Sequence, residues 1–216
     1  MYNREQLLNL LDEGLSTLGI SLSDSQCQQL IEYLQLMVRW NKAYNLTAIK
    51  DPAEMVSRHL LDSLAVLPYI EGDRLIDVGT GGGLPGIPLA IACPQRQHTL
   101  LDSNGKKTRF LFQVRNQLSL GNVREIHMRV EKYQPEQLFD VVISRAFSSL
   151  QDMLENCSHL LNPDGCFQAM KGKYPTSELS QLPKGYKVVA SNSICVPRLN
   201  EERHLITLVS EPADNP

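Results

Sequence analysis

The sequence predicts an α/β fold: a mostly parallel, seven-stranded sheet with an antiparallel last strand, preceded by a helical extension. Three observations support this prediction. Apolar residues recur at helical spacing up to about residue 70, short apolar runs then alternate with helical stretches, and two β-branched-rich runs close the chain without a helix between them. At 216 residues, we expect an extension over 1–70 packed on a core over 71–216.

The first 70 residues contain three expected helices. Leucines at helical spacing predict the first over 7–18, and a similar apolar series predicts the second over 30–38. Ser23 with Gln26 three positions later is typical of a capping box that begins the second helix. A proline at the first helical position begins the third, over 52–68.

The remainder of the chain predicts strands joined by helices. The seven expected strands are LIDV (75–78), HTLLD (98–102), NVREIH (122–127), DVVIS (140–144), GCFQAMK (165–171), YKVVASNSICV (186–196) and RHLITLVS (203–210). The helices expected between them are 86–93, 104–120, 131–137 and 148–161. Strand and helix alternation indicates a parallel sheet with right-handed crossovers, whereas the last two runs should pair as an antiparallel hairpin.

Composition excludes several classes of protein. The longest apolar stretch, 84–93, contains two prolines and is far shorter than the roughly 20 residues of a membrane span. The N-terminus has no signal-peptide core, so we expect a cytoplasmic protein without a membrane partner. Five scattered cysteines, never spaced C-x-x-C, predict reduced thiols and no metal site.

Charge is unevenly distributed along the chain. The net charge of −3 gives no global sign of nucleic-acid binding. Residues 103–134, however, carry seven basic and two acidic side chains, a local charge of +5. A solvated helix face and an RNA-facing surface both explain such a run, and charge alone does not decide between them.

The clearest local motif is a strand that runs directly into glycines. Four of the five residues after Val78 are glycine, and Gly79, Gly81 and Gly83 can adopt positive φ and let a ligand approach the backbone. The spacing fits two patterns, the loop of S-adenosylmethionine-dependent methyltransferases (GxGxG from Gly79) and a dinucleotide fingerprint (GxGxxG from Gly81). Asp102, at the end of the second strand, suits ribose hydroxyls in both.

Two features of the chain favour the methyl donor over a dinucleotide. The expected antiparallel last strand is typical of the methyltransferase fold, and no second domain remains to hold a hydride-transfer substrate. The glycine loop and Asp102 therefore predict an S-adenosylmethionine site.

Further motifs occur in order through about four fifths of the chain. They are WNKAYNLTAI (40–49), SRHLLDSL (57–64), IDVGTGGGLPGIPLAI (76–91), LLDSNGKKTRFL (100–111), RVEKY (129–133), FDVVISRAF (139–147), MKG (170–172) and ERHLI (202–206). With them the chain resembles the glucose-inhibited division protein B family, known as RsmG. The resemblance implies a Rossmann-like class I methyltransferase that uses S-adenosylmethionine to methylate N7 of a guanine in small-subunit (16S) ribosomal RNA.

The resemblance also assigns residues to the donor site. It implies contacts from Gly79 and Leu84 in the first loop, from Val130 and Glu131 after the third strand, and from Arg145 after the fourth. To these the residue-level argument adds Gly81, Gly83 and Asp102. All follow the carboxyl ends of expected parallel strands, where ligands of open α/β sheets bind.

The expected chemistry requires no general base, so we predict no acid–base catalytic residue. Guanine N7 has a free lone pair, and the enzyme must align it with the methyl group and exclude water. An arginine fork on O6 and N7 would cover the reacting atom, so basic residues should reach phosphates or O6 alone. The candidates for RNA binding are Arg129, Arg145, Lys171 and Arg203, with Arg145 and Lys171 as positioning candidates. The target is expected in a loop, because A-form duplex hides N7.

Other functions remain open at this point. The chain could methylate another RNA or a small molecule, act as a non-catalytic ribosome assembly factor, or belong to the NAD-dependent oxidoreductases through the second glycine pattern. The sequence leaves open whether the RNA is free, in a ribosomal subunit or in an assembly intermediate. It also leaves open the oligomeric state and any contact of the N-terminal helices with RNA.

Overall fold

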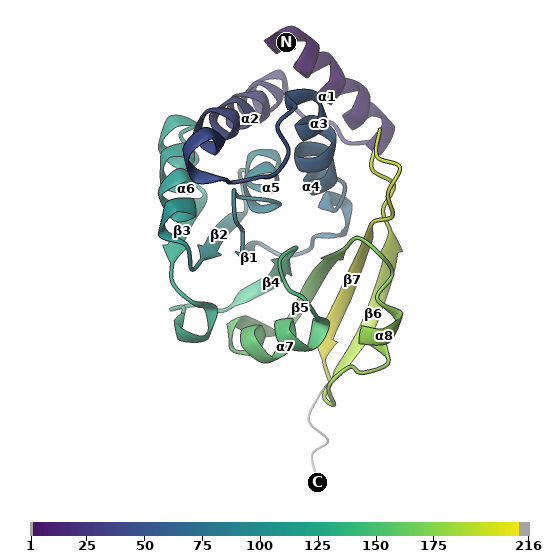
Figure 1. Cartoon of the computed structure of the whole chain (residues 1–216). Helices are drawn as coiled ribbons and strands as arrows, with labels where there is room; N and C mark the ends of the chain where they lie inside the picture. Colours follow the sequence, from purple (N-terminus) through teal and green to yellow (C-terminus); the bar gives the residue numbers. More distant parts are fainter. Residues whose placement is uncertain (1, 212–216) are drawn as a thin grey trace.

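The computed structural model, described here for residues 2–211, is a single twisted sheet with helices on both faces (Figure 1). The seven strands lie in the order β3-β2-β1-β4-β5-β7-β6. Their bounds are β1 Arg74–Val78, β2 Gln97–Asp102, β3 Val123–His127, β4 Phe139–Ser144, β5 Leu161–Lys171, β6 Tyr186–Ser193 and β7 His204–Ser210. The predicted mostly parallel sheet of seven strands is confirmed.

Strand direction brings several loops to one edge of the sheet. The strands β3, β2, β1, β4 and β5 are parallel, whereas β7 is antiparallel to both β5 and β6, as the predicted hairpin requires. Lys171, the last residue of β5, pairs with His204, the first of β7. The start of β7 therefore lies at the same edge as the carboxyl ends of the parallel strands, where ligands of such sheets bind.

The N-terminal helices begin at side-chain caps. Helix α1 (Arg4–Leu18) is capped by Asn3, and α2 (Asp24–Tyr44) by the predicted box of Ser23 and Gln26, in which the Ser23 Oγ accepts from the Gln26 N–H at 3.3 Å. The third helical region consists of α3 (Pro52–Met55), a π-helical segment (Val56–Leu61), α4 (Asp62–Leu64) and a 3₁₀ turn (Leu67–Tyr69). The predicted third helix therefore exists but is distorted in its middle.

Two buried clusters hold the layers together. The first cluster packs helices α1, α2, α3 and α4, together with α5 (Gly86–Ala92) and α6 (Gly105–Gln117), against one face of the sheet. The second cluster packs α7 (Leu150–Cys157) against the other face. In β4 the side chains alternate, so Val141 and Ile143 enter the first cluster and Val142 the second. The N-terminal helices thus share a core with the sheet. A domain division at residue 70 stays a prediction, and residues 212–216 lie outside the described residues.

One predicted helix is wrong. Residues 131–137 do not form a helix; a 3₁₀ turn spans Val130–Lys132 and the chain then runs irregularly into β4. Pro135 explains the error, because proline disfavours helical backbone at the residue before it and removes a helical N–H donor. A short helix that the sequence did not predict, α8 (Thr176–Leu179), follows β5.

Three further features of the described residues concern membrane spans, cysteines and clustered metal-ligating side chains. No helix among them is long and apolar enough to cross a membrane. All five cysteines are free thiols, with Cys27, Cys93 and Cys157 buried. Within residues 2–211, no group of three or more His, Cys, Asp or Glu side chains is arranged to hold a metal ion.

Candidate active site

The glycine loop after β1 has the backbone that the sequence predicted. Gly79 and Gly81 have φ of 70° and 62°, in a region of backbone conformation that residues with a Cβ rarely adopt. A Cβ on Gly79 would lie 2.8 Å from the Cβ of Ala146. Ala146 is itself fixed, because its N–H donates to Ser144 Oγ at 3.1 Å and that hydroxyl donates to the Val78 carbonyl at 2.7 Å. The ends of β1 and β4 are therefore locked together at this loop.

The buried carboxylate of Asp77 stabilises the glycine loop through hydrogen bonds. Asp77 Oδ2 accepts from the Thr80 hydroxyl at 2.6 Å and from the Gly86 N–H at 2.9 Å. Burial raises the pKa of Asp77 to about 6, although both hydrogen bonds lower it. From the N-terminal region, the Tyr33 hydroxyl donates to the Gly82 carbonyl at 2.6 Å. Helix α2 therefore helps to hold the loop in place.

Asp102, at the end of β2, faces the same loop. Its Oδ2 accepts from the Gly81 N–H at 2.9 Å and lies 3.6 Å from Lys107 Nζ; its Oδ1 accepts from the Asn104 N–H at 2.8 Å. Because a carboxylate oxygen has two lone pairs, each can still accept a ligand hydroxyl. Asp102 thus joins the glycine loop to the start of α6.

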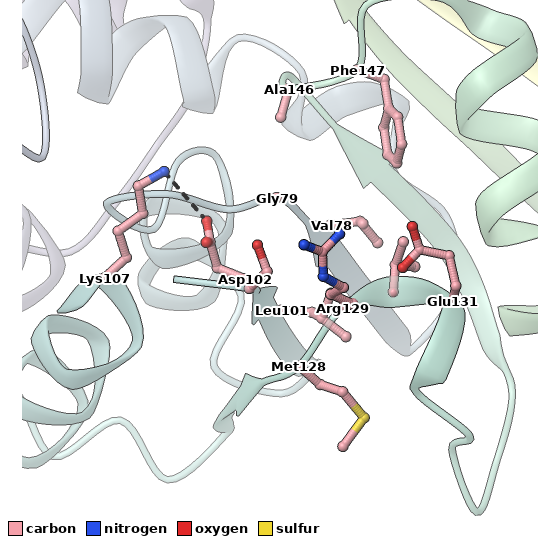
Figure 2. Close-up of a pocket in the computed structure, with 12 residues that line it drawn as sticks. Val78, Gly79, Leu101, Asp102, Lys107, Met128, Arg129, Glu131, Ala146 and Phe147 are labelled. Atoms are coloured by element: carbon pink, nitrogen blue, oxygen red, sulfur yellow. Dashed lines mark ion pairs between the residues drawn. The ribbon is translucent and has the colours of Figure 1, made fainter. Parts of the chain in front are cut away.

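These elements surround a cavity of about 310 Å³, which we call the glycine-loop hollow (Figure 2). Its walls come from the carboxyl ends of β1, β2, β3 and β4. The lining residues are Val78, Gly79, Leu101, Asp102, Ser103, Lys107, Met128, Arg129, Val130, Glu131, Ala146 and Phe147. In Figure 2 the side chain of Arg129 points into the middle of this ring. The hollow therefore offers apolar walls together with charges of both signs.

The structure separates the predicted donor-site residues into two groups. Gly79, Asp102, Val130 and Glu131 line the glycine-loop hollow, and Gly81 binds Asp102 through its N–H. Arg129, expected on the RNA side, also lines this hollow.

The other expected donor residues lie away from the hollow. Leu84 is packed in the first buried cluster, and a Cβ on Gly83 would lie 2.5 Å from Ile87 Cγ1, so this glycine serves packing. Sequence reasoning did not assign the other seven lining residues to this site, and all of them except Met128 stand inside motifs that the sequence analysis singled out. They are Val78, Leu101, Ser103, Lys107, Met128, Ala146 and Phe147.

A second cavity, which we call the arginine hollow, measures about 360 Å³. It gathers three predicted residues, Arg145, Lys171 and Arg203, from the ends of β4 and β5 and the start of β7. Its complete lining is Ile49, Arg58, His59, Arg145, Met170, Lys171, Gly172 and Arg203. Arg145, which lines this cavity, directly precedes Ala146, which lines the glycine-loop hollow, so the chain after β4 contributes to both cavities.

Asp62 holds two of these arginines. Arg145 Nη1 donates to Asp62 Oδ2 at 3.1 Å, and Arg203 Nε donates to Asp62 Oδ1 at 2.9 Å. The Asp62 side chain is only 2% exposed, whereas that of Arg145 is 34% exposed. One buried carboxylate therefore fixes both guanidinium groups. Arg203 is held further, because its Nη1 donates to the Glu202 carbonyl at 2.8 Å and its Nη2 donates to Glu201 Oε2 at 3.0 Å.

The other walls of the arginine hollow are also fixed. Lys171 Nζ lies 2.9 Å from Glu178 Oε2, which also accepts from the Leu150 N–H. His59 Nε2 lies 2.9 Å from Thr47 Oγ1. Burial, reinforced by the nearby Arg145 charge, lowers the pKa of His59 to about 4. His59 is therefore neutral near pH 7.

The basic side chains of segment 103–134, with its local charge of +5, fall into paired and exposed groups in the structure. It comprises α6, β3 and the turn after β3. Lys107 pairs with Asp102 and lines the glycine-loop hollow, and Arg115 lies 3.4 Å from Glu125. Lys106 and Arg109 are exposed on α6. Only part of the basic run is therefore available as an outer surface.

The sheet order, the glycine loop and the acidic end of β2 define the class of protein, an open α/β sheet with the fold of S-adenosylmethionine-dependent methyltransferases. Solved structures have the same fold. One S-adenosylmethionine-dependent methyltransferase from Thiobacillus denitrificans, in complex with S-adenosylhomocysteine, aligns over 82% of this chain and 98% of its own with a TM-score of 0.53 and 15% identity. A second, from Geobacter sulfurreducens, gives 0.54 over 82% and 98% at 14% identity.

Sequence comparison identifies the family. Residues 26–206 match the family model GidB, described as rRNA small subunit methyltransferase G. The ribosomal RNA small subunit methyltransferase G of Saccharophagus degradans is 55% identical over 205 residues, 95% of this chain and 92% of the relative. That of Klebsiella pneumoniae is 53% identical over 202 residues, 94% and 98%. The chain belongs to the rRNA small subunit methyltransferase G family.

Proposed function

We propose that this protein transfers a methyl group from S-adenosylmethionine to N7 of a guanine in small-subunit (16S) ribosomal RNA. The observation that carries the proposal is the family match over residues 26–206. The two cavities support it, because one offers carboxylates and cations to a ligand that carries both charges, and the other is lined by three arginines and a lysine. The RNA substrate accords with a cytoplasmic location.

The glycine-loop hollow fits the donor. When bound, S-adenosylmethionine supplies a methyl group on a positively charged sulfur. Asp102 and Glu131 offer carboxylates for hydroxyl and amino groups, and Lys107 and Arg129 offer cations for a carboxylate. The positive φ of Gly79 favours glycine, and the absence of a Cβ there lets Ala146 pack against the loop beside the hollow. These residues therefore offer partners for the hydroxyl, amino and carboxylate groups of the donor.

The arginine hollow would hold the RNA beside the reacting atoms. Arg145, Lys171 and Arg203 can reach phosphates or guanine O6 while leaving N7 uncovered. Asp62 and Glu178 balance much of their charge. This balance matters because methylation places a positive charge on the base, and an uncompensated cluster of cations would repel it. The protein then has to align guanine N7 with the methyl group and exclude water, and no proton has to be removed from N7.

The rate of single-turnover methylation should be independent of pH from about 7 to 8.5. Guanine N7 needs no base, the pKa of His59 is about 4, and the pKa of Asp77 is about 6, so both groups have completed their titration below this range. The first change should appear as pH falls through about 6, when Asp77 gains a proton and its hydrogen bonds to the glycine loop weaken. A rise with an apparent pKa near 7 to 8 in the chemical step would require a catalytic base and contradict the mechanism.

Exposed bases on α6 should contribute to RNA affinity through charge. We expect Lys106→Ala with Arg109→Ala to reduce the slope of log affinity against log salt by up to about one to two units, because fewer counterions are released on binding. Donor affinity should not change, since neither residue lines the glycine-loop hollow. Lys107 is unsuitable for this purpose because it pairs with Asp102. An unchanged slope, measured by filter binding from 50 to 200 mM salt, would show this face to be merely solvated.

Transfer of labelled methyl groups tests the proposal as a whole. The purified protein with S-adenosylmethionine should label small-subunit RNA, offered both protein-free and as isolated subunits, and should leave large-subunit RNA unlabelled. Calorimetry should show binding of S-adenosylmethionine and none of NAD. Binding of RNA without the donor, and without transfer, would instead indicate an assembly factor.

A further inference from the structure

One exposed carboxylate bridges two arginines at the arginine hollow. Glu201, in the connection between β6 and β7, pairs through Oε1 with Arg58 Nη2 and through Oε2 with Arg203 Nη2, the latter at 3.0 Å. Both arginines line the hollow, whereas Glu201 does not. Arg58 comes from the π-helical segment and Arg203 from the residue before β7, so the carboxylate joins two distant parts of the chain.

Glu201 differs from the other carboxylate that holds Arg203. The Asp62 side chain is 2% exposed and lies beneath the arginines, whereas the Glu201 side chain is 45% exposed. Exposed ion pairs contribute little to stability because water and salt screen them, whereas a buried, hydrogen-bonded carboxylate is costly to remove. Glu201 can therefore leave at small cost, and Asp62 cannot.

Both arginines would keep their places without Glu201. Arg58 Nε also lies 2.7 Å from Glu54 Oε1 one helical turn earlier, and Arg203 Nε remains bound to Asp62 Oδ1 at 2.9 Å. Departure of Glu201 would therefore expose two oriented guanidinium edges. Two oxygens of one carboxylate now occupy those edges, and two non-bridging oxygens of a phosphate have the same charge-assisted pairing with arginine.

We propose that Arg58 and Arg203 bind a phosphate group of the substrate RNA, and that the carboxylate of Glu201 occupies this site until the phosphate displaces it. The proposal rests on the proposed function, because it takes RNA as the substrate. It assigns Arg58 to the RNA site and makes Glu201 a competitor of the phosphate. The two roles predict opposite effects of substitution.

Neutralising Glu201 should strengthen RNA binding. We expect Glu201→Gln to lower the dissociation constant for protein-free small-subunit RNA by about two- to fivefold at 50 mM salt, the scale of an exposed ion pair. The salt slope should become steeper by up to about one unit, because ions that replace Glu201 are released. Arg58→Gln in the Glu201→Gln background should abolish the gain. Donor affinity should equal that of the wild type in every variant.

Glu13→Gln is the matched control. Glu13 lies 3.7 Å from Arg198, so this change also removes one exposed, arginine-paired carboxylate, away from the hollow. Its RNA affinity should match the wild type. If Glu201→Gln binds RNA no tighter than wild type, or if Glu13→Gln tightens binding equally, the phosphate site is wrong. In that case wild-type methylation of the same RNA would leave the proposed function standing, whereas absence of methylation by the wild type would overturn both.

Discussion

Replacing Gly81 with valine should abolish binding of S-adenosylmethionine and leave the protein folded. Gly81 has φ of 62°, and a Cβ built on it meets nothing nearer than the Gly79 carbonyl oxygen and Lys107 Nζ, both at 4.0 Å. The branched side chain would therefore project beside the hollow without clashing with the core. Backbone strain of about 1–2 kcal/mol is tolerable for a folded protein. We expect at least a hundredfold weaker donor binding by calorimetry.

Substitutions at two other glycines distinguish a loss of donor binding from a loss of folding. Gly19, the C-cap of α1, has φ of 67° and nothing within 4 Å of an added Cβ, so Gly19→Val carries similar strain away from the site. Its donor affinity should equal that of the wild type. At Gly83 the added Cβ would lie 2.5 Å from Ile87 Cγ1 and 2.9 Å from Leu111 Cδ2, so Gly83→Val should unfold the protein. Wild-type donor affinity in Gly81→Val would disprove the role of this loop.

The second large effect is expected from Asp62→Asn, which should reduce methylation at saturating RNA by at least about tenfold. The amide keeps the shape of the carboxylate but loses the charge that orients Arg145 and Arg203. Donor affinity should change much less than the rate, because Asp62 does not line the glycine-loop hollow. Stability should fall by about 1–3 kcal/mol, since two partly exposed arginines lose their buried partner.

Asp140→Asn controls for stability alone. Asp140 Oδ2 accepts from the N–H groups of Asp73 and Arg74 at 2.9 Å each, before β1 and at its start, away from the edge that carries the two hollows. It should destabilise the protein without changing the rate at saturating RNA and donor. If Asp62→Asn also turns over at the wild-type rate, Asp62 serves the fold rather than the RNA site.

Local sequence patterns predicted most of the fold. The strands, the hairpin and the capping box at Ser23 depend on residues close together in the chain, and the structure confirms them. The error at 131–137 was also local, since Pro135 opposed the apparent helical pattern. The π-helical distortion at Val56–Leu61 was not predicted, because six residues are too few for the change to i→i+5 bonding to alter the apolar pattern visibly.

The site was only partly predictable for a different reason. The glycine loop and Asp102 follow strands that pair directly, so their proximity follows from topology. The pairs of Asp62 with Arg145 and Arg203 join residues 83 and 141 positions apart, and no periodicity encodes them. The assignment of Arg145 to the donor remains a prediction, although the structure places this residue with Lys171 and Arg203 in the arginine hollow.

The chemical identity of the product tests the account most directly. Small-subunit RNA methylated by the purified protein should be treated with borohydride and aniline, which cleave the chain at N7-methylguanine. The account predicts a single cleavage at one unpaired guanine, present with wild type, absent without S-adenosylmethionine and absent with Gly81→Val. Stable incorporation of the methyl group into RNA that resists this cleavage would place it on another atom and contradict the base-free mechanism.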